Sequence, residues 1–152
     1  MIDPAVLAPL LALVATQTVS GPDPVSAVRL EPVIFTQAPS LGPGDPYSLL
    51  VWEDHRRFTG PIISYGRIAA DGGLLDPYGL EIPALGTRPV AAFAGGRFLV
   101  VFSNFGGNNT RLFGALVELD GGAGAPFPVV SMSVDQLDPQ LAAAPDGGFI
   151  LA

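Results

Sequence analysis

The sequence predicts an all-β protein built from repeats of about fifty residues, each with four short strands. The chain has 19 glycines and 16 prolines among 152 residues, more than helices of ordinary length tolerate. Yet 49% of it is hydrophobic and only 14% is charged, so it should bury a core. Pro39, Pro89 and Pro139 are spaced fifty residues apart, and a fixed period of this size is typical of stacked or radially arranged units.

An apolar run at residues 4–15 precedes the repeats. It is too short to span a bilayer and matches the apolar part of a signal peptide, although no basic residue precedes it. Two interpretations stay open, a signal-peptide remnant and a short hydrophobic helix or strand packed on the domain. We expect residues 1–20 to be an apolar leader outside the folded repeats. We expect residues 21–38 to be a linker with the tail of a preceding repeat.

The strands follow from short apolar runs bounded by turn residues. In repeat 1, residues 39–88, we expect strands at residues 49–52 and 62–69. In repeat 2, residues 89–138, we expect four strands, and residues 139–152 form the truncated start of repeat 3. The four strands of repeat 2 are expected at residues 89–93, 98–102, 112–117 and 127–130.

Alignment of the chain with itself supports these boundaries. Residues 49–52 align with residues 99–102 at an offset of 50, and Tyr65-Gly66 aligns with Phe113-Gly114 at an offset of 48. The Asp-Gly-Gly segment at residues 71–73 recurs 49 residues later. Because glycine accepts positive φ, we interpret the Asp-Gly-Gly segments as tight turns.

Four strands in about fifty residues is the size of one propeller blade, so we predict a partial β-propeller. A β-sandwich and a β-solenoid remain alternatives, because both can be built from short strands and glycine turns. A closed ring needs at least about four blades. We therefore expect an incomplete propeller, or a fragment of a longer chain, with open strand edges through which copies can self-associate.

Residues 47–56 and 65–82 carry the most specific motifs. They resemble the tandem repeat of large exported bacterial proteins, which runs as Tyr-Leu-Val-Val-Trp, Asp-x-Arg, Tyr-Gly-x-Arg, Asp-Gly and Leu-Asp-Pro-x-Gly. The second copy departs from this pattern, with Ala115 in place of Arg67. The resemblance implies a repetitive, propeller-like protein that is secreted or held at the cell surface. It implies no activity, and no catalytic residues are carried over.

Charge and composition exclude several classes of function. Seven arginines, no lysine and 14 acidic residues give a net charge of −7, without the basic patch that nucleic-acid binding needs. The chain has no cysteine, which excludes disulfides, thiolate metal sites and a cysteine nucleophile. We predict no catalytic, cofactor-binding or metal-binding residues, and no cofactor.

Three polar residues, Glu53, Asp54 and His55, directly follow the strand expected at residues 49–52. His55 is either a general base oriented by Glu53 or Asp54, or a solvated loop histidine, which we favour. Glu53 and Asp54 point to opposite faces of a strand, which argues against a shared acid/base or Ca²⁺ site. We expect Asp54 to cap a turn or to pair with Arg56 or Arg67.

Trp52 and Phe102 occupy equivalent positions at the ends of apolar strands. Such aromatics either stack on sugars or pack between repeats, and we favour packing. We therefore predict a non-enzymatic exported scaffold or interaction module whose partner is a protein or a glycan. The alternatives are a carbohydrate-binding propeller lectin and a glycoside hydrolase-like enzyme that uses Asp54 or Asp76 as a carboxylate.

Overall fold

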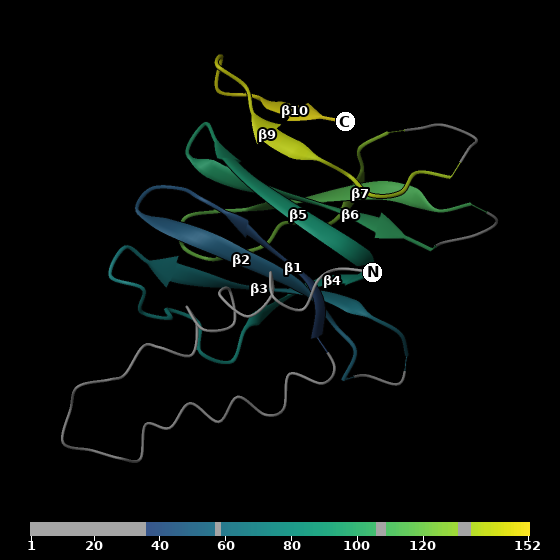
Figure 1. Cartoon of the computed structure of the whole chain (residues 1–152), viewed down its shortest axis with the longest axis horizontal. Helices are drawn as coiled ribbons and strands as arrows, with labels where there is room; N and C mark the ends of the chain where they lie inside the picture. The colour runs from purple at the N-terminus through teal and green to yellow at the C-terminus, as the bar shows by residue number, and fades with distance from the viewer. Residues whose placement is uncertain (1–35, 57–58, 106–108, 131–134) are drawn as a thin grey trace, which may run out of the picture. The chain divides into compact units, whose positions relative to one another are not determined.

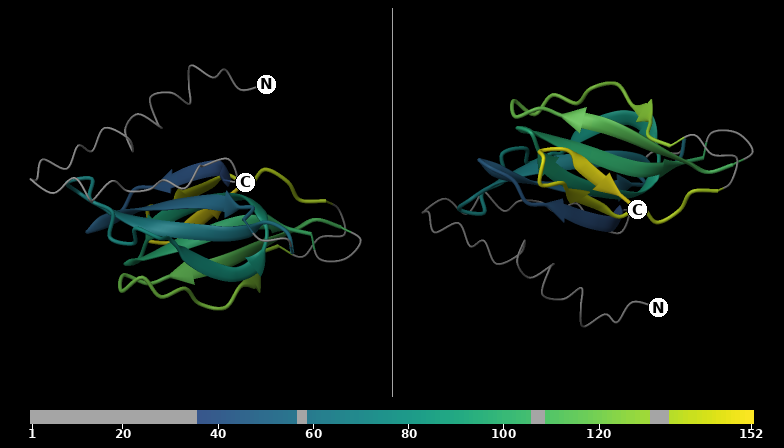
Figure 2. Two further views of the ribbon diagram at one scale, coloured as in Figure 1. Left: turned by 90° about the horizontal axis from the view of Figure 1, so that it is seen from below. Right: turned by 90° about the horizontal axis from the view of Figure 1, so that it is seen from above.

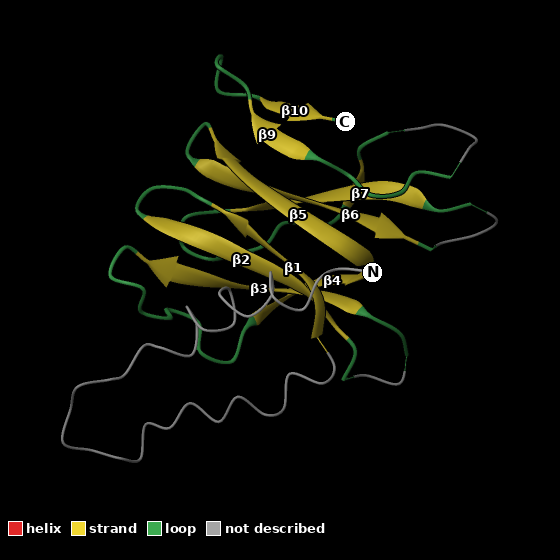
Figure 3. Ribbon diagram, in the orientation of Figure 1, coloured by secondary structure: helices red, strands yellow, loops and turns green. Residues whose placement is uncertain are grey.

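The structure is a computed structural model that describes residues 36–56, 59–105, 109–130 and 135–152. In these ranges it consists of strands, turns and loops, without helices (Figure 3). The all-β prediction is therefore confirmed. The predicted leader, residues 1–20, and most of the predicted linker, residues 21–38, lie outside the described residues. Residues 36–38 belong to the first strand instead of to a linker.

Sheet 1 is a four-stranded antiparallel sheet whose strands are neighbours in the order in which they follow in the chain (Figure 1). Buried and partly buried residues alternate along its second strand from Tyr47 to Glu53, so every second side chain is buried against the rest of the protein. Its strands are β1 (Thr36–Gly42), β2 (Tyr47–Asp54), β3 (Ile62–Ala69) and β4 (Leu80–Leu85).

Sheet 2 repeats this arrangement with four antiparallel strands in chain order. Its second strand is a continuous apolar run that is buried on both faces, as expected for a strand between two other layers. The strands are β5 (Thr87–Ala94), β6 (Arg97–Asn104), β7 (Arg111–Val117) and β8 (Phe127–Pro128).

The end of the chain forms a separate hairpin of two antiparallel strands, β9 (Leu141–Ala143) and β10 (Phe149–Leu151). The described residues thus form three open antiparallel sheets. Figure 1 shows the order of the layers, with sheet 2 between sheet 1 and the yellow hairpin, and Figure 2 shows the same layers from below and from above.

The main core lies between sheets 1 and 2. We call the faces that meet there the front face of sheet 1 and the back face of sheet 2. Their buried side chains form one cluster, in which alternate residues of β2 pack against alternate residues of β6. The cluster includes Tyr47, Leu49, Val51, Ile63, Tyr65, Ile82, Ala91, Phe98, Val100, Phe102, Ala115 and Val117.

A second, smaller core lies on the other side of sheet 2, its front face. There Leu99, Val101 and Leu112 pack against three apolar side chains of the hairpin. Those three side chains are Leu141, Phe149 and Leu151. Sheet 2 is therefore covered on both faces.

The strand register allows residues of the two sheets to be compared by their partners. Leu49 pairs with Arg67 in sheet 1, and Leu99 pairs with Leu116 in sheet 2, so the third strands correspond at an offset of 49. Tyr65 then corresponds to Gly114, and the predicted match of Tyr65 with Phe113 is wrong by one residue. The cause is that the connection between the second and third strands is one residue shorter in sheet 2. Leu116, and not Ala115, stands at the place of Arg67.

The three Asp-Gly-Gly segments form turns of the same kind, as predicted. In each, the aspartate side chain accepts a hydrogen bond from the backbone N–H two residues further on, at 2.8–3.0 Å. The middle glycine of each has positive φ. The three aspartates are Asp71, Asp120 and Asp146.

Candidate functional site

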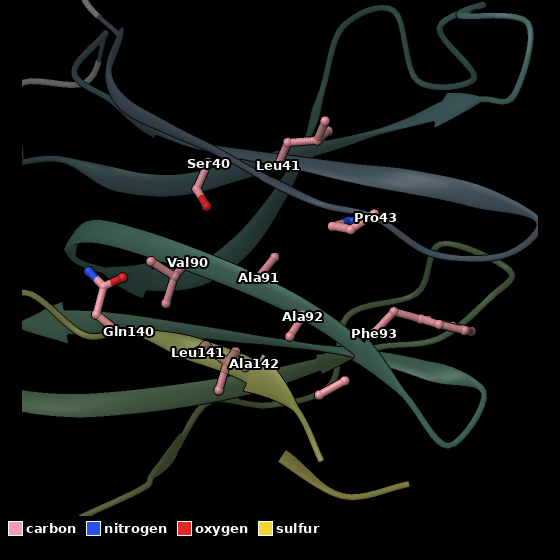
Figure 4. A pocket seen from close by; sticks show the side chains of 11 residues that line it. Ser40, Leu41, Pro43, Val90, Ala91, Ala92, Phe93, Gln140, Leu141 and Ala142 are labelled. Atoms are coloured by element: carbon pink, nitrogen blue, oxygen red, sulfur yellow. The ribbon is translucent and has the colours of Figure 1, made fainter. Parts of the chain in front are cut away.

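The first strands of the three sheets, β1, β5 and β9, lie together and enclose a cavity of about 320 Å³ (Figure 4). Each of them is an edge strand of its own sheet, so part of its backbone N–H and C=O groups is free of strand pairing. The lining side chains are mostly small or aliphatic. They belong to Ser40, Leu41, Pro43, Val90, Ala91, Ala92, Phe93, Gln140, Leu141, Ala142 and Ala143.

A second hollow, of about 460 Å³, lies where the same three strands begin. Its polar contact is an ion pair of 2.8 Å between the Arg88 guanidinium and the Asp138 carboxylate. The chain has positive φ at Ala38, Arg88 and Asp138, each directly before a proline. A β-bulge interrupts the pairing of β1 with β2 at this place, and another interrupts the pairing of β5 with β6. The residues with positive φ therefore bend the two strands in the same way.

Glu53 and His55 form a polar contact at the end of β2. The buried Glu53 carboxylate accepts a hydrogen bond from the backbone N–H of Arg88, at 2.7 Å, and lies 2.9 Å from His55 Nε2. Glu53 thus ties the end of sheet 1 to the bulge at the start of β5. His55 lies in the loop after β2, as expected, with its side chain partly buried against this carboxylate.

Asp54 points to the other face of sheet 1, as the alternation along a strand predicts. Its buried carboxylate accepts hydrogen bonds from the backbone and the guanidinium of Arg56 and lies 3.4 Å from Ser64 Oγ. The hydrogen bonds from Arg56 hold the pKa of Asp54 below its ordinary value. The predicted pairing of Asp54 with Arg56 is confirmed. Arg67 pairs elsewhere.

Arg67 makes a two-point ion pair with Asp76. Its Nε and Nη2 donate to the two carboxylate oxygens at 2.8 Å each, and its backbone N–H donates to the same carboxylate at 2.9 Å. Hydrogen bonding by Arg67 lowers the pKa of Asp76, and the same contact raises the pKa of Arg67. The Leu-Asp-Pro motif therefore anchors the connection after β3 to the Tyr-Gly-x-Arg strand.

Three side chains of sheet 1 hold backbone carbonyls in the turn after β7, and we call Tyr47, Tyr65 and Arg67 the carbonyl clamp. Tyr65 Oη donates to the carbonyl of Gly121 at 2.8 Å, and Tyr47 Oη donates to that of Glu118 at 3.1 Å. Arg67 Nη1 lies 3.4 Å from a third carbonyl in the same turn, and its guanidinium lies 5.5 Å from the centre of the Tyr47 ring.

The clamp was not recognised from the sequence as a unit. Both tyrosines and Arg67 stand in the repeat motif, but their common target is a turn about fifty to seventy residues further along the chain. Burial raises the pKa of both tyrosines, so their hydroxyls stay protonated donors at neutral pH. The available signal was the spacing of two residues, which puts Tyr47 on the same face as Leu49 and Val51, and Tyr65 and Arg67 on the same face as Ile63.

Trp52 and Phe102 correspond in the strand register but differ in burial. Phe102 is fully buried in the main core, so it is a packing residue as favoured, and the sugar-stacking alternative is wrong for it. Trp52 lies on the opposite face of sheet 1 from the main core and is only partly buried. Its ring lies over Gly66 and Gly79, and added Cβ atoms there would come within 3.7 and 2.8 Å of it.

The chain was also compared with known proteins. No family model, no curated protein and no solved structure matches it. The described residues contain no group of three or more His, Cys, Asp or Glu side chains suited to a metal ion. In the same residues, no helix has the length and apolar character that crossing a bilayer requires.

Proposed function

We propose that this chain is a non-enzymatic scaffold or interaction module built from propeller-like β repeats of about fifty residues. The observation that carries the proposal is the convergence of the first strands. Among strands of different sheets, β5 makes the most extensive contacts, and it makes them with β1, β2 and β9. In a propeller the first strands of neighbouring blades lie together around the axis, and contacts centred on β5 therefore support blades over the two layers of a sandwich.

The correspondence between the sheets supports a repeat. Sheets 1 and 2 have the same strand order, and their first two strands match at an offset of 50. The residues with positive φ before Pro39, Pro89 and Pro139 recur at the same spacing. The turns after β3 and β7 also share their hydrogen bonds, with isolated bridges between Ile68 and Leu74 and between Val117 and Ala123.

The carboxylates of Asp54, Asp76 and Glu53 are bound by other groups of the fold, which favours a scaffold over a glycoside hydrolase. Asp54 and Asp76 are each held by an arginine, and their lowered pKa keeps them ionised. A hydrolase needs one carboxyl group with a raised pKa to protonate the leaving group. Glu53 is occupied by a backbone N–H and by His55. These carboxylates stabilise the fold, and we propose that the protein turns over no substrate.

Binding through the cavity of the first strands would suit a protein or glycan partner. The free backbone groups of three strand edges can hydrogen-bond an elongated ligand, while the small aliphatic side chains leave room for it. A carbohydrate-binding lectin is the second candidate function, because Trp52 is partly exposed and an aromatic face can stack on a sugar. The export of the protein is also a proposal, and it rests on the family resemblance and the apolar segment at residues 4–15.

Distances between spin labels test the propeller-like arrangement. Because the chain has no cysteine, cysteine pairs can be introduced and labelled without interference. One pair, Asp45→Cys with Gly95→Cys, marks the turns after β1 and β5, and another, Tyr78→Cys with Ala125→Cys, marks exposed residues before β4 and β8. We expect a clearly longer distance for the second pair, because β4 and β8 lie at the sheet edges opposite β1 and β5. Equal distances would favour a sandwich or a solenoid.

Activity assays test the scaffold assignment separately. We expect no turnover of aryl glycosides by the wild-type chain. Glycan-array binding that Trp52→Ala abolishes would instead support the lectin alternative. Turnover that Asp54→Asn or Asp76→Asn abolishes would establish the enzyme alternative and overturn the proposed function.

A further inference from the structure

The back face of sheet 1, opposite the main core, is only partly covered by the described residues: Asp54 and Ser64 at one end are buried, whereas Leu41, Leu50 and Trp52 are not. Its positions are matched one for one by the back face of sheet 2, where every corresponding residue is buried against sheet 1. On the back face of sheet 1, Leu41 is 49% exposed, and Leu50 and Trp52 are only partly buried. The matched pairs are Leu41 with Ala91, Ser48 with Phe98, Leu50 with Val100, Trp52 with Phe102, Gly66 with Ala115 and Ile68 with Val117.

The hairpin presents the complementary half of this arrangement. Ala142 pairs with Ile150 as Ala92 pairs with Leu99 in sheet 2, so Ile150 stands at the place of Leu99. Leu99 is buried where the hairpin covers the front face of sheet 2. Ile150 is 54% exposed on the hairpin's outer face. Among the described residues, the outer face of the hairpin and the back face of sheet 1 are therefore the two faces without a covering sheet.

We propose that these two faces bind each other between copies of this chain, so that the hairpin of one copy docks on the back face of sheet 1 of the next. Two internal interfaces already follow this rule, since the front face of sheet 1 covers sheet 2 and the front face of sheet 2 is covered by the hairpin. The contact between copies would again pack a front face on a back face, as the two internal interfaces do. The inference therefore rests on the proposed repeat.

The chemistry of both faces suits such a contact. Leu41 lies on β1, and Leu50 and Trp52 lie on β2, so the apolar residues occupy two neighbouring strands that a two-stranded hairpin can cover. Ile150 and Ala142 offer an aliphatic surface without charge. Because the two surfaces differ, the contact is heterologous, and it gives a ring if the rotation closes and a filament if it does not.

Two single variants and their mixture test the proposal in the full-length chain. Leu41→Asp places a charge on the back face of sheet 1, and Ile150→Asp places one on the hairpin. Each residue is already half exposed, so the folded copy tolerates the change. Leu137→Asp, at a leucine that is 52% exposed in the connection before β9, is the matched control. Molar mass is measured by light scattering and sedimentation over a range of protein concentrations.

We expect the wild-type chain and Leu137→Asp to self-associate with rising concentration. Each of the other two variants should weaken association about tenfold or more, because the contact would bury an unpaired carboxylate. An equimolar mixture of Leu41→Asp and Ile150→Asp should form a one-to-one dimer, since each variant keeps the half that the other has lost. Rescue in the mixture separates this head-to-tail contact from a symmetric one.

Other results overturn the proposal. A monomeric wild type does so. Absence of rescue in the mixture, or equal weakening by Leu137→Asp, also overturns it. The spin-label distances, measured in the Leu41→Asp, Ile150→Asp double variant, test the repeat arrangement within one copy. Failure of self-association and failure of the proposed repeat are therefore distinguishable.

Discussion

Sheets 1 and 2 share their strand order but hold their neighbours by different means. Sheet 1 binds sheet 2 through an apolar core and the carbonyl clamp. In sheet 2 the places of Tyr47, Tyr65 and Arg67 are occupied by Arg97, Gly114 and Leu116, and the hairpin is held by apolar contacts.

The comparison shows that apolar packing is common to both interfaces of sheet 2, with sheet 1 and with the hairpin. The polar clamp is an addition at one of them. Phe102 and Trp52 occupy corresponding positions but differ in burial, since Phe102 lies on a covered face and Trp52 lies on a partly covered one. Substitutions at corresponding places can therefore measure what a covered face contributes to stability.

The largest effect is expected from Phe102→Ala. Removing a fully buried ring between two sheets should lower the free energy of unfolding by about 3–5 kcal/mol. Trp52→Ala, at the corresponding place on the partly covered face, should cost about 2 kcal/mol, because less of its surface leaves water on folding. Urea unfolding of monomeric protein measures both. An equal or greater cost for Trp52→Ala would contradict the idea that the back face of sheet 1 is only partly covered within one copy.

Gly79→Ala should have the next largest effect. Gly79 has a φ of +73°, and an added Cβ would lie 2.8 Å from the Trp52 ring. We expect a loss of about 2–4 kcal/mol from backbone strain and crowding together. Gly96→Ala is the control, since Gly96 has a φ of +79° but no neighbour within 4 Å, and it should cost about 1–2 kcal/mol. Equal losses in thermal unfolding would mean that the tryptophan moves aside freely.

Asp76→Asn should destabilise the protein by about 1–3 kcal/mol at neutral pH, because Arg67 loses a carboxylate acceptor. The pKa of Asp76 is lower in the folded chain than in the unfolded chain. Its contribution is therefore present above the unfolded pKa of about 4 and is lost as the pH falls through the lower folded pKa. The difference between wild type and variant should shrink at low pH.

Denaturation midpoints at neutral and acidic pH measure this effect. Arg67→Met serves as the control, because it removes the same ion pair from the other side and should abolish the same pH dependence. A difference between wild type and Asp76→Asn that stays constant through acid would show that the ion pair does not stabilise the fold.

The smallest effect is expected from the clamp hydroxyls. Tyr65→Phe removes one buried hydrogen bond to the Gly121 carbonyl and should cost about 1 kcal/mol. Tyr47→Phe should cost less, because its bond to the Glu118 carbonyl is longer and only partly buried. Hydrogen exchange of the turn at residues 118–122 should rise more in Tyr65→Phe. A reversed order would show that Tyr47 carries the clamp.

Most of the strands were predictable from the sequence because each apolar run is bounded by glycine or proline turns. Residues 49–52, 62–69, 98–102 and 112–117 all lie within observed strands. The strand predicted at residues 127–130 is only Phe127–Pro128 in the structure; Pro128 offers no N–H to the ladder, and a single further hydrogen bond, from the Val129 N–H to the Leu112 carbonyl at 3.0 Å, follows it.

The candidate site was less predictable, since its contacts join residues far apart in the chain. The pairing of Asp54 with Arg56 spans two residues and could be anticipated. Glu53 binds a backbone N–H 35 residues away, and no pattern of side chains announces a backbone partner. The alignment of Tyr65 with Phe113 failed because residue similarity favoured an aromatic match, whereas the hydrogen-bonding register placed a glycine there.

The carbonyl clamp has an evolutionary consequence. It recognises only main-chain oxygens, which every residue type possesses, so the side chains of the held turn are free to change without loss of these bonds. Only Gly121 is constrained, because an added Cβ would lie 2.7 Å from the Arg67 guanidinium carbon. A duplicated segment with this clamp could accept a diverged neighbour from the first generation, provided that one glycine persisted. Neighbouring copies could then drift apart in sequence while their contact was preserved.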